Sequence, residues 1–292
     1  MIPPTFDLSK QHWHYLRYYG YYDLEIIRKQ IAKYLINREL MLFHKSNPYA
    51  IRYLESKDFN DLTKYLKYYI RKPSNILNLY YSLAEFKEGS LRDSFNFLEY
   101  DKEEMKKNAA QNIVKYDFLL DIDAPSRETL IPLTISARKI KDFFDKLHVP
   151  YYLRFSGMGF HFVIPYDYIA PYLPKINLHP FSDYNIYAYF ALIAKFLKEK
   201  FSEYICMNVY DYRRVAKIPY SISVYDEEDQ YIVLPINSFE GFHPEKMHIK
   251  NVTFFPEDIL HNPEGNCKFL VEKALSSAET VFENSFRGVK YK

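Results

Sequence analysis

The chain has 292 residues, of which 48% are hydrophobic and 26% charged, and its formal net charge is +2. This composition excludes a disordered or membrane-spanning chain, and the near-neutral charge gives no support by itself for nucleic-acid binding. The two cysteines, Cys206 and Cys267, are too few for a disulfide framework or a four-thiolate zinc site, so no structural zinc is expected. The first residues lack the basic and then apolar pattern of a signal peptide. We therefore expect an intracellular protein of the cytoplasm or nucleoid, or of the nucleus if the source is eukaryotic.

The first part of the chain carries helical and then extended patterns. Residues 23–39 and 60–72 have apolar side chains at helical spacing, which predicts two helices that each pack on one face. Residues 77–82 form a short extended stretch. The polar, Lys- and Glu-rich stretch 86–112 predicts a loop and a surface helix.

The second part of the chain is denser in predicted structure. Residues 116–122 (YDFLLDI) are a continuous apolar run of strand length, which is typical of a buried strand. The other predicted elements are helices at 136–147, 185–201 and about 267–282, and strands at 151–155, 160–165 and 231–235. This order predicts an α/β (α+β) fold in which helices pack against a mixed sheet.

Two carboxylates follow the buried strand directly. On a strand, Asp121 and Asp123 point to the same side while Ile122 points back to the core. Two hard oxygen ligands at a strand end suit Mg²⁺ or Mn²⁺, and two such ions can stabilise the attacking and leaving oxygens of a phosphoryl transfer. The alternative is an acidic strand end that simply enters a loop.

A glycine-containing turn separates the strands predicted at 151–155 and 160–165. The segment SGMGFH places Gly157 and Gly159, two of only seven glycines, beside Ser156 and His161. Such a turn exposes backbone N–H groups, and with the serine and the histidine it can bind a phosphate. The alternative is a tight glycine hairpin whose histidine makes its hydrogen bonds within the protein.

A basic stretch follows the helix predicted at 185–201. In DYRRVAKIPYS, Arg213, Arg214 and Lys217 lie within five residues. Arginine forks and lysine point charges are the groups that recognise phosphate. The alternative is a charged face that is exposed to solvent.

In this order the segments FLLDIDA, RFSGMGFHFVIP and DYRRVAKIPYSIS resemble the archaeo-eukaryotic primase superfamily, most of all its small catalytic subunit and its primase-polymerases. That family has Asp-x-Asp at a strand end, a Ser-Gly-rich turn that ends in His, and a basic segment that ends in x-Pro-x-Ser. Residues 37–40, 51–53 and 80–82 resemble the Arg-Glu-Phe, Arg-Tyr and Tyr-Tyr-Ser motifs of that family. The likeness covers residues from roughly 15 to 240.

The resemblance implies a metal site and a nucleotide site. Asp121 and Asp123 would bind the two Mg²⁺ or Mn²⁺ ions of a two-metal site. The nucleotide-binding residues would contact or support the phosphates of a nucleoside triphosphate: Ser156, Gly157, His161, Arg214, Lys217 and Arg38.

The sequence departs from the family pattern at three places. The third metal-binding aspartate falls at Cys206 or Ile205, so Asp211 is the predicted third ligand and Asn208 the second candidate. The turn is one residue shorter than in cellular primases and has Met158 where they have basic residues. It is more similar to the turn of plasmid, viral or repair enzymes. The histidine that often follows the Pro-x-Ser serine by two residues is replaced by Ser223.

The implied fold is an RNA-recognition-motif-like catalytic module joined to an N-terminal α/β module in a single primase-type domain. We predict the N-terminal module at 1–112, the catalytic module at 113–245 and a C-terminal helical extension at 246–292. The implied function is that of a DNA primase or primase-polymerase. It would act on nucleoside triphosphates and a single-stranded DNA template, with a large subunit or replication proteins as partners and no membrane. The alternatives are a primer-dependent gap-filling or end-joining repair polymerase and a catalytically silent scaffold that binds nucleotides or DNA.

Overall fold

Two four-stranded sheets, sheet I and sheet II, form the centre of the protein in the computed structural model. The model describes residues 5–7, 21–44, 47–55, 59–69, 77–90, 110–174, 178, 185–207, 210–224 and 230–287. Sheet I has the order β13 (Leu234–Pro235), β8 (Tyr152–Phe155), β9 (Gly159–Ile164) and β7 (Phe118–Asp123). Sheet II has the order β10 (Val215–Lys217), β4 (Leu77–Ser82), β2 (Glu39–His44) and β3 (Asn47–Glu55).

Sheet I is apolar on the face that packs against two long helices, α6 (Leu130–Lys146) and α8 (Ile186–Phe201). Phe162 of β9 contacts Phe144 of α6 edge to face, with ring centroids 5.6 Å apart. Phe118 of β7 makes the same kind of contact with Phe190 of α8 at 5.2 Å. Because side chains alternate along a strand, the polar residues of β7 and β9 lie on the opposite face.

The strand pairs of sheet I are antiparallel, which corrects the expectation of a mixed sheet. The chain runs from β7 through α6 to β8, and these two strands point the same way. They are not neighbours, however, because β9 lies between them and pairs with both. The tight turn from β8 to β9 produces this arrangement, since a hairpin makes consecutive strands antiparallel neighbours.

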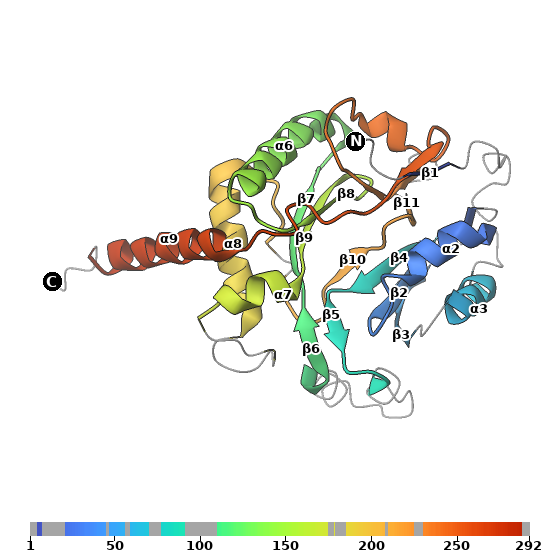
Figure 1. The fold of residues 1–292 in the computed structure, drawn as a ribbon, viewed down its shortest axis with the longest axis horizontal. Coiled ribbons are helices and arrows are strands. Elements are labelled where there is room, and N and C mark those ends of the chain that lie inside the picture. Colours follow the sequence, from blue (N-terminus) through green and yellow to red (C-terminus); the bar gives the residue numbers. More distant parts are fainter. Residues whose placement is uncertain are drawn as a thin grey trace.

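Sheet II packs its apolar face against α2 (Glu25–Ala32) and α3 (Phe59–Tyr69), which lie on its outer side in Figure 1. Its inner edge strand comes from a distant part of the chain. Val215, Ala216 and Lys217 of β10 pair with residues 80–82 of β4. The parts predicted as an N-terminal module and a catalytic module therefore share a sheet.

The described fold also contains three two-stranded sheets and several short helices. The sheets are β1 (Thr5–Asp7) with β14 (Phe254–Pro256), β5 (Ala84–Phe86) with β6 (Ile113–Tyr116), and β11 (Ile222–Val224) with β12 (Gln230–Ile232). The short helices are η2 (Arg127–Thr129), α7 (Tyr166–Ile169), η3 (Ala170–Tyr172) and η4 (Pro244–Met247). The segment predicted as a helical extension thus also contains a strand, β14.

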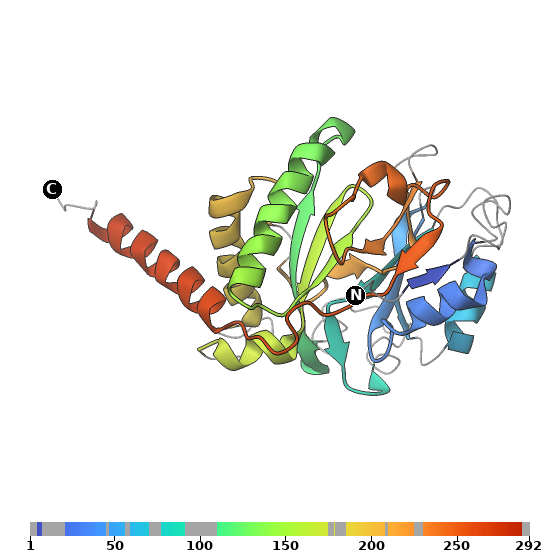
Figure 2. The same ribbon diagram turned by 45° about the horizontal axis from the view of Figure 1, so that its top comes forward.

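The last helix, α9 (Lys268–Arg287), begins beside α8 and points away from the body of the protein in both ribbon views (Figures 1 and 2). Within the residues that the structure describes, no helix is long and apolar enough to cross a membrane.

Candidate functional site

The carboxylate pair lies at the end of β7, on the polar face of sheet I. Asp121 is buried, with a side chain only 3% exposed, whereas Asp123 is exposed. Ile122 between them is fully buried on the side of the helices. The strand geometry predicted from Asp-Ile-Asp is therefore present.

Two basic side chains contact the buried carboxylate. The Nε2 of His161 lies 3.3 Å from Oδ1 of Asp121, and Nη2 of Arg214 donates a hydrogen bond to Oδ2 at 2.5 Å. Burial raises the pKa of Asp121, but His161 and Arg214 outweigh it and the net shift is downward. The pKa of Asp123 is raised, by partial desolvation and then by the negative charge of Asp121. The two neighbouring carboxyls thus differ in acidity.

The glycine turn brings β8 and β9 close to neighbouring backbone. Gly157 has φ +103°, and a Cβ there would lie 2.5 Å from Oγ of Ser223. A Cβ on Gly159 would lie 1.9 Å from the carbonyl oxygen of Ile122. Only glycine fits at either position, so both glycines are explained by conformation and close packing. The side chain of Ser156 is buried beside this turn.

Lys217 connects β10 of sheet II with the turn in sheet I. Its Nζ donates hydrogen bonds to the carbonyl oxygen of Ser156 at 2.9 Å and to Oγ of Ser223 at 2.7 Å. Burial lowers the pKa of Lys217, whereas the charges of Asp123 and Asp121 act in the opposite direction. The three cations of the basic stretch therefore do not all lie at the same site. Arg214 bonds to Asp121, and the charges of both carboxylates act on Lys217, whereas Arg213 is exposed.

Several buried polar atoms at this site have no hydrogen-bond partner among the described residues. They are Oδ1 of Asp121, which has only the 3.3 Å contact with His161, Oγ of Ser156, Nδ1 of His161 and Nε of Arg214. Buried polar groups in proteins are nearly always hydrogen-bonded, so such a cluster is typical of a place where a ligand or ion binds. The acceptor left on Asp121 and the exposed carboxylate of Asp123 are hard oxygen donors, which fits Mg²⁺ or Mn²⁺.

The structure does not bring the predicted third ligand to the pair. The Oδ1 of Asp211 accepts a hydrogen bond from the backbone N of Arg213 at 2.7 Å, and its side chain is 48% exposed. Cys206 lies directly beside the pair, because its backbone N donates to the carbonyl oxygen of Asp121 at 2.9 Å. Asn208 lies outside the described residues. Within the described part of the chain, no three His, Cys, Asp or Glu side chains are grouped so that they could hold a metal ion.

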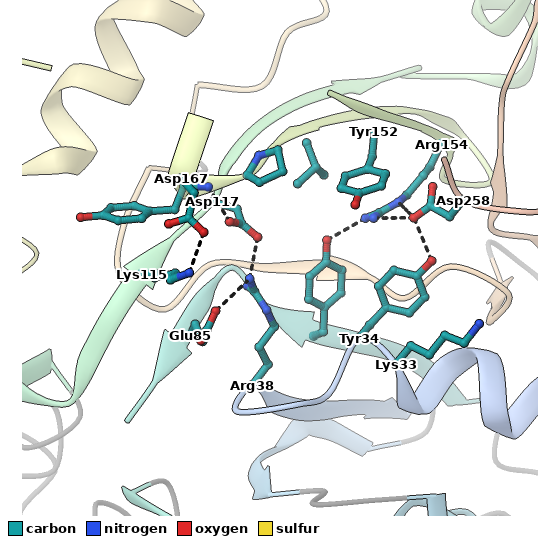
Figure 3. A pocket seen from close by; sticks show the side chains of 14 residues that line it. Lys33, Tyr34, Arg38, Glu85, Lys115, Asp117, Tyr152, Arg154, Asp167 and Asp258 are labelled. Atoms are coloured by element: carbon teal, nitrogen blue, oxygen red, sulfur yellow. Dashed lines mark hydrogen bonds and ion pairs between the residues drawn. The ribbon is translucent and has the colours of Figure 1, made fainter. Parts of the chain in front are cut away.

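Arg38 is also not brought to the carboxylate pair. Its guanidinium donates to the carbonyl oxygens of Ser82 and Leu83 and to Oδ2 of Asp117 at 2.7 Å. It lines a separate cavity of about 360 Å³ between sheet I and sheet II (Figure 3). The charged side chains that line this cavity largely pair with one another, and a buried arginine, Arg154, closes one end.

Two residues near the site were missed at the level of sequence. In the sequence, Ser223 stands out only as a departure from a family pattern, yet its hydroxyl contacts Lys217. Arg154 of β8 is the register partner of His161 on β9, and His161 is the register partner of Asp121 on β7. A charged residue inside the apolar strand sequence YYLRF was the available signal for Arg154, because a buried charge requires a partner.

The acidity of Asp123 gives a test of the site that needs no ligand. We expect a carboxyl ¹³C NMR titration to give Asp123 a pKa above the ordinary aspartate value, which is about 3.9. In an Asp121→Asn variant this pKa should fall toward the ordinary value, because the negative neighbour is lost. An unchanged pKa in the variant would show that the two carboxyls do not interact. Asp167→Asn, at an exposed position away from the pair, is the control.

The fold and the site define a protein of antiparallel sheets and helices with a buried cluster of carboxylate and basic side chains. No family model matches the chain, and no curated protein matches it. Among solved structures, it is similar to a chain titled "Crystal structure of primase RepB'", with a TM-score of 0.41 and 12% sequence identity. The match covers 89% of this chain and 65% of that primase, so this chain spans less than two thirds of that primase's length.

Proposed function

We propose that the protein is a DNA primase or primase-polymerase, which joins nucleoside triphosphates on a single-stranded DNA template and releases pyrophosphate. The observation that carries the proposal is the cluster of unsatisfied buried polar atoms around Asp121, in which Ser156, His161 and Arg214 take part. Acidic oxygens for metal ions and cationic donors for phosphates are the two sets of groups that nucleotidyl transfer requires.

Each group has a distinct task in this proposal. Asp121 and Asp123 would hold Mg²⁺ or Mn²⁺, which when bound neutralises developing charge on the phosphate oxygens. His161 and Ser156 would donate hydrogen bonds to the phosphates of the incoming nucleotide. Lys217 and Arg214 would offset the negative charge of the triphosphate. Rate acceleration would then come mainly from positioning and electrostatics, without a side-chain base.

A primer-free synthesis assay tests the proposal. The protein is incubated with single-stranded DNA, Mg²⁺ or Mn²⁺, and either ribonucleotides or deoxyribonucleotides. We expect dinucleotides and longer products to form without a primer. Products that form only when a primer is supplied would instead identify a repair polymerase. Absence of any product under both conditions would contradict a polymerase of either kind.

A catalytically silent scaffold is the second candidate, and one observation favours it. Cys206, and not a carboxylate, lies next to Asp121 at the edge of β7, where its backbone N donates to the carbonyl oxygen of Asp121. The carboxylate of Asp211 instead accepts a hydrogen bond from the backbone N of Arg213. A scaffold of this kind would bind metal and nucleotide without forming a polymer. Calorimetric titration with nucleotide, carried out beside the synthesis assay, distinguishes it from the enzyme.

A further inference from the structure

Ser223 lies next to the site on β11 and is buried, with only 3% of its surface exposed. Its Oγ is 2.7 Å from Nζ of Lys217, and the carbonyl oxygen of Ser156 accepts from the same nitrogen at 2.9 Å. A lysine ammonium has three N–H donors. Two of them therefore bond to the protein, and their directions fix the direction of the third.

The position of Ser223 is fixed by close packing against the glycine turn. A Cβ on Gly157 would lie 2.5 Å from Oγ and 2.8 Å from Cβ of Ser223. A larger residue at either position would push β11 away from the turn. The absence of a side chain at Gly157 thus leaves the space that Ser223 fills, and the small serine places a hydroxyl within reach of Lys217.

Lys217 is also attracted to the two carboxylates. Asp123 and Asp121 both act on its charge, and a lysine stem is flexible enough to swing toward them. An ammonium that moved onto the carboxylates would neutralise them and would no longer be available to a phosphate. The two acceptors on Ser223 and Ser156 hold it at the turn instead.

We propose that Ser223 is a positioning residue, which together with the Ser156 carbonyl holds the Lys217 ammonium so that its third N–H faces the nucleotide phosphates. This inference rests on the proposed function, because it assigns Lys217 to a triphosphate. It goes further by assigning a task to a hydroxyl at a position where the related pattern often has histidine.

The first test compares the Ser223→Ala variant with a matched control, Ser221→Ala. The hydroxyl of Ser221 is also buried, but it donates to the carbonyl oxygen of Ile218 at 2.6 Å. The affinities for a nucleoside triphosphate and for the unphosphorylated nucleoside are measured by calorimetry. We expect S223A to bind the triphosphate roughly tenfold more weakly, as for loss of a charge-assisted hydrogen bond, and the nucleoside equally well. S221A should match the wild type for both ligands.

A second variant guards against loss of packing at this tight position. Ser223→Gly removes the acceptor and the Cβ as well, so it disturbs the packing more than S223A does but the hydrogen bond equally. It should show the same loss of triphosphate affinity as S223A. In the synthesis assay, both variants should raise the KM for nucleotide and leave the metal affinity unchanged.

A measurement without nucleotide separates this inference from the proposed function. In protein with ¹⁵N-labelled lysine, we expect an ammonium signal of Lys217 that is protected from solvent exchange in the wild type and S221A and is lost in S223A. If the wild type binds no triphosphate, both the proposed function and the assigned task of Ser223 fail. If the wild type binds it and S223A binds it equally well, only the inference is overturned. Unchanged protection of the signal in S223A would also overturn it.

Discussion

Asp121→Asn and Asp123→Asn are each expected to lower primer synthesis by at least about 10³-fold. Loss of a metal-binding carboxylate removes several kcal/mol of charge stabilisation, and each 1.4 kcal/mol corresponds to about a tenfold change in rate. Asp121→Asn also leaves Arg214 without its anionic partner. The rate is measured with saturating nucleotide and template, with Mg²⁺ and Mn²⁺ in separate reactions. Binding of single-stranded DNA, measured by fluorescence anisotropy, should persist in both variants.

Asp167→Asn provides the matched control, because it makes the same chemical change at an exposed side chain that pairs with Lys115. Its synthesis rate should equal that of the wild type. Wild-type synthesis by the Asp121→Asn/Asp123→Asn double variant would exclude the pair as the metal site. Loss of DNA binding together with synthesis would indicate a folding defect, which thermal unfolding of each variant detects.

The second large effect is expected from the buried ion pair of Arg154 and Asp258. Its side chains are 3% and 5% exposed, and Nε and Nη2 of Arg154 donate to Oδ2 of Asp258 at 3.0 and 2.7 Å. Nη1 of Arg154 donates to the hydroxyl of Tyr81, and the hydroxyl of Tyr34 donates to Asp258. Figure 3 shows Arg154, Asp258 and Tyr34 converging from separate elements. The pair therefore joins sheet I to sheet II and to the segment that follows α2.

Arg154→Met should lower the free energy of unfolding by about 3–5 kcal/mol, because it leaves the Asp258 carboxylate buried without a counter-charge. The Arg154→Met/Asp258→Leu double variant should recover most of this loss, since neither charge of the pair remains buried. Urea unfolding measures all three proteins. Lys115→Met breaks the exposed pair with Asp167 and should cost about 0–1 kcal/mol. An Arg154→Met variant as stable as the wild type would show that this ion pair does not hold the two sheets together.

Much of the secondary structure was predictable because local pattern determines it. The predicted strand at 77–82 coincides with β4, and the helix predicted at 185–201 differs from α8 by one residue, since Asn185 is the N-cap. The predicted helix at 23–39 ends too late. α2 ends at Ala32, and Glu39 already begins β2. Apolar residues keep the helical spacing beyond Ala32. The residues from Glu39 onward nevertheless form a strand, because pairing with β4 stabilises them more than a longer helix would.

The carboxylates, the glycine turn and the basic residues of the candidate site could be selected from the sequence, because each is a local pattern with a chemical meaning. Their mutual contacts could not. Arg38 was assigned to the same nucleotide site, yet its guanidinium is bound by Asp117 and by backbone carbonyls in a separate cavity. Asp211 was assigned to the metal site, yet it caps a turn at Arg213. Sequence distance does not show which charges become neighbours.

That Asp121 and Asp123 lie on one side of β7 follows from the local pattern alone, because alternation along a strand is a property of the backbone. The local pattern also determined that the turn at Gly157 would be tight. The pairing of β10 with β4 in sheet II, which brings Lys217 to Ser156 and Ser223, depends instead on contacts between distant parts of the chain. Such long-range pairing depends on the packing of all layers together, and no local pattern in residues 211–221 encodes it.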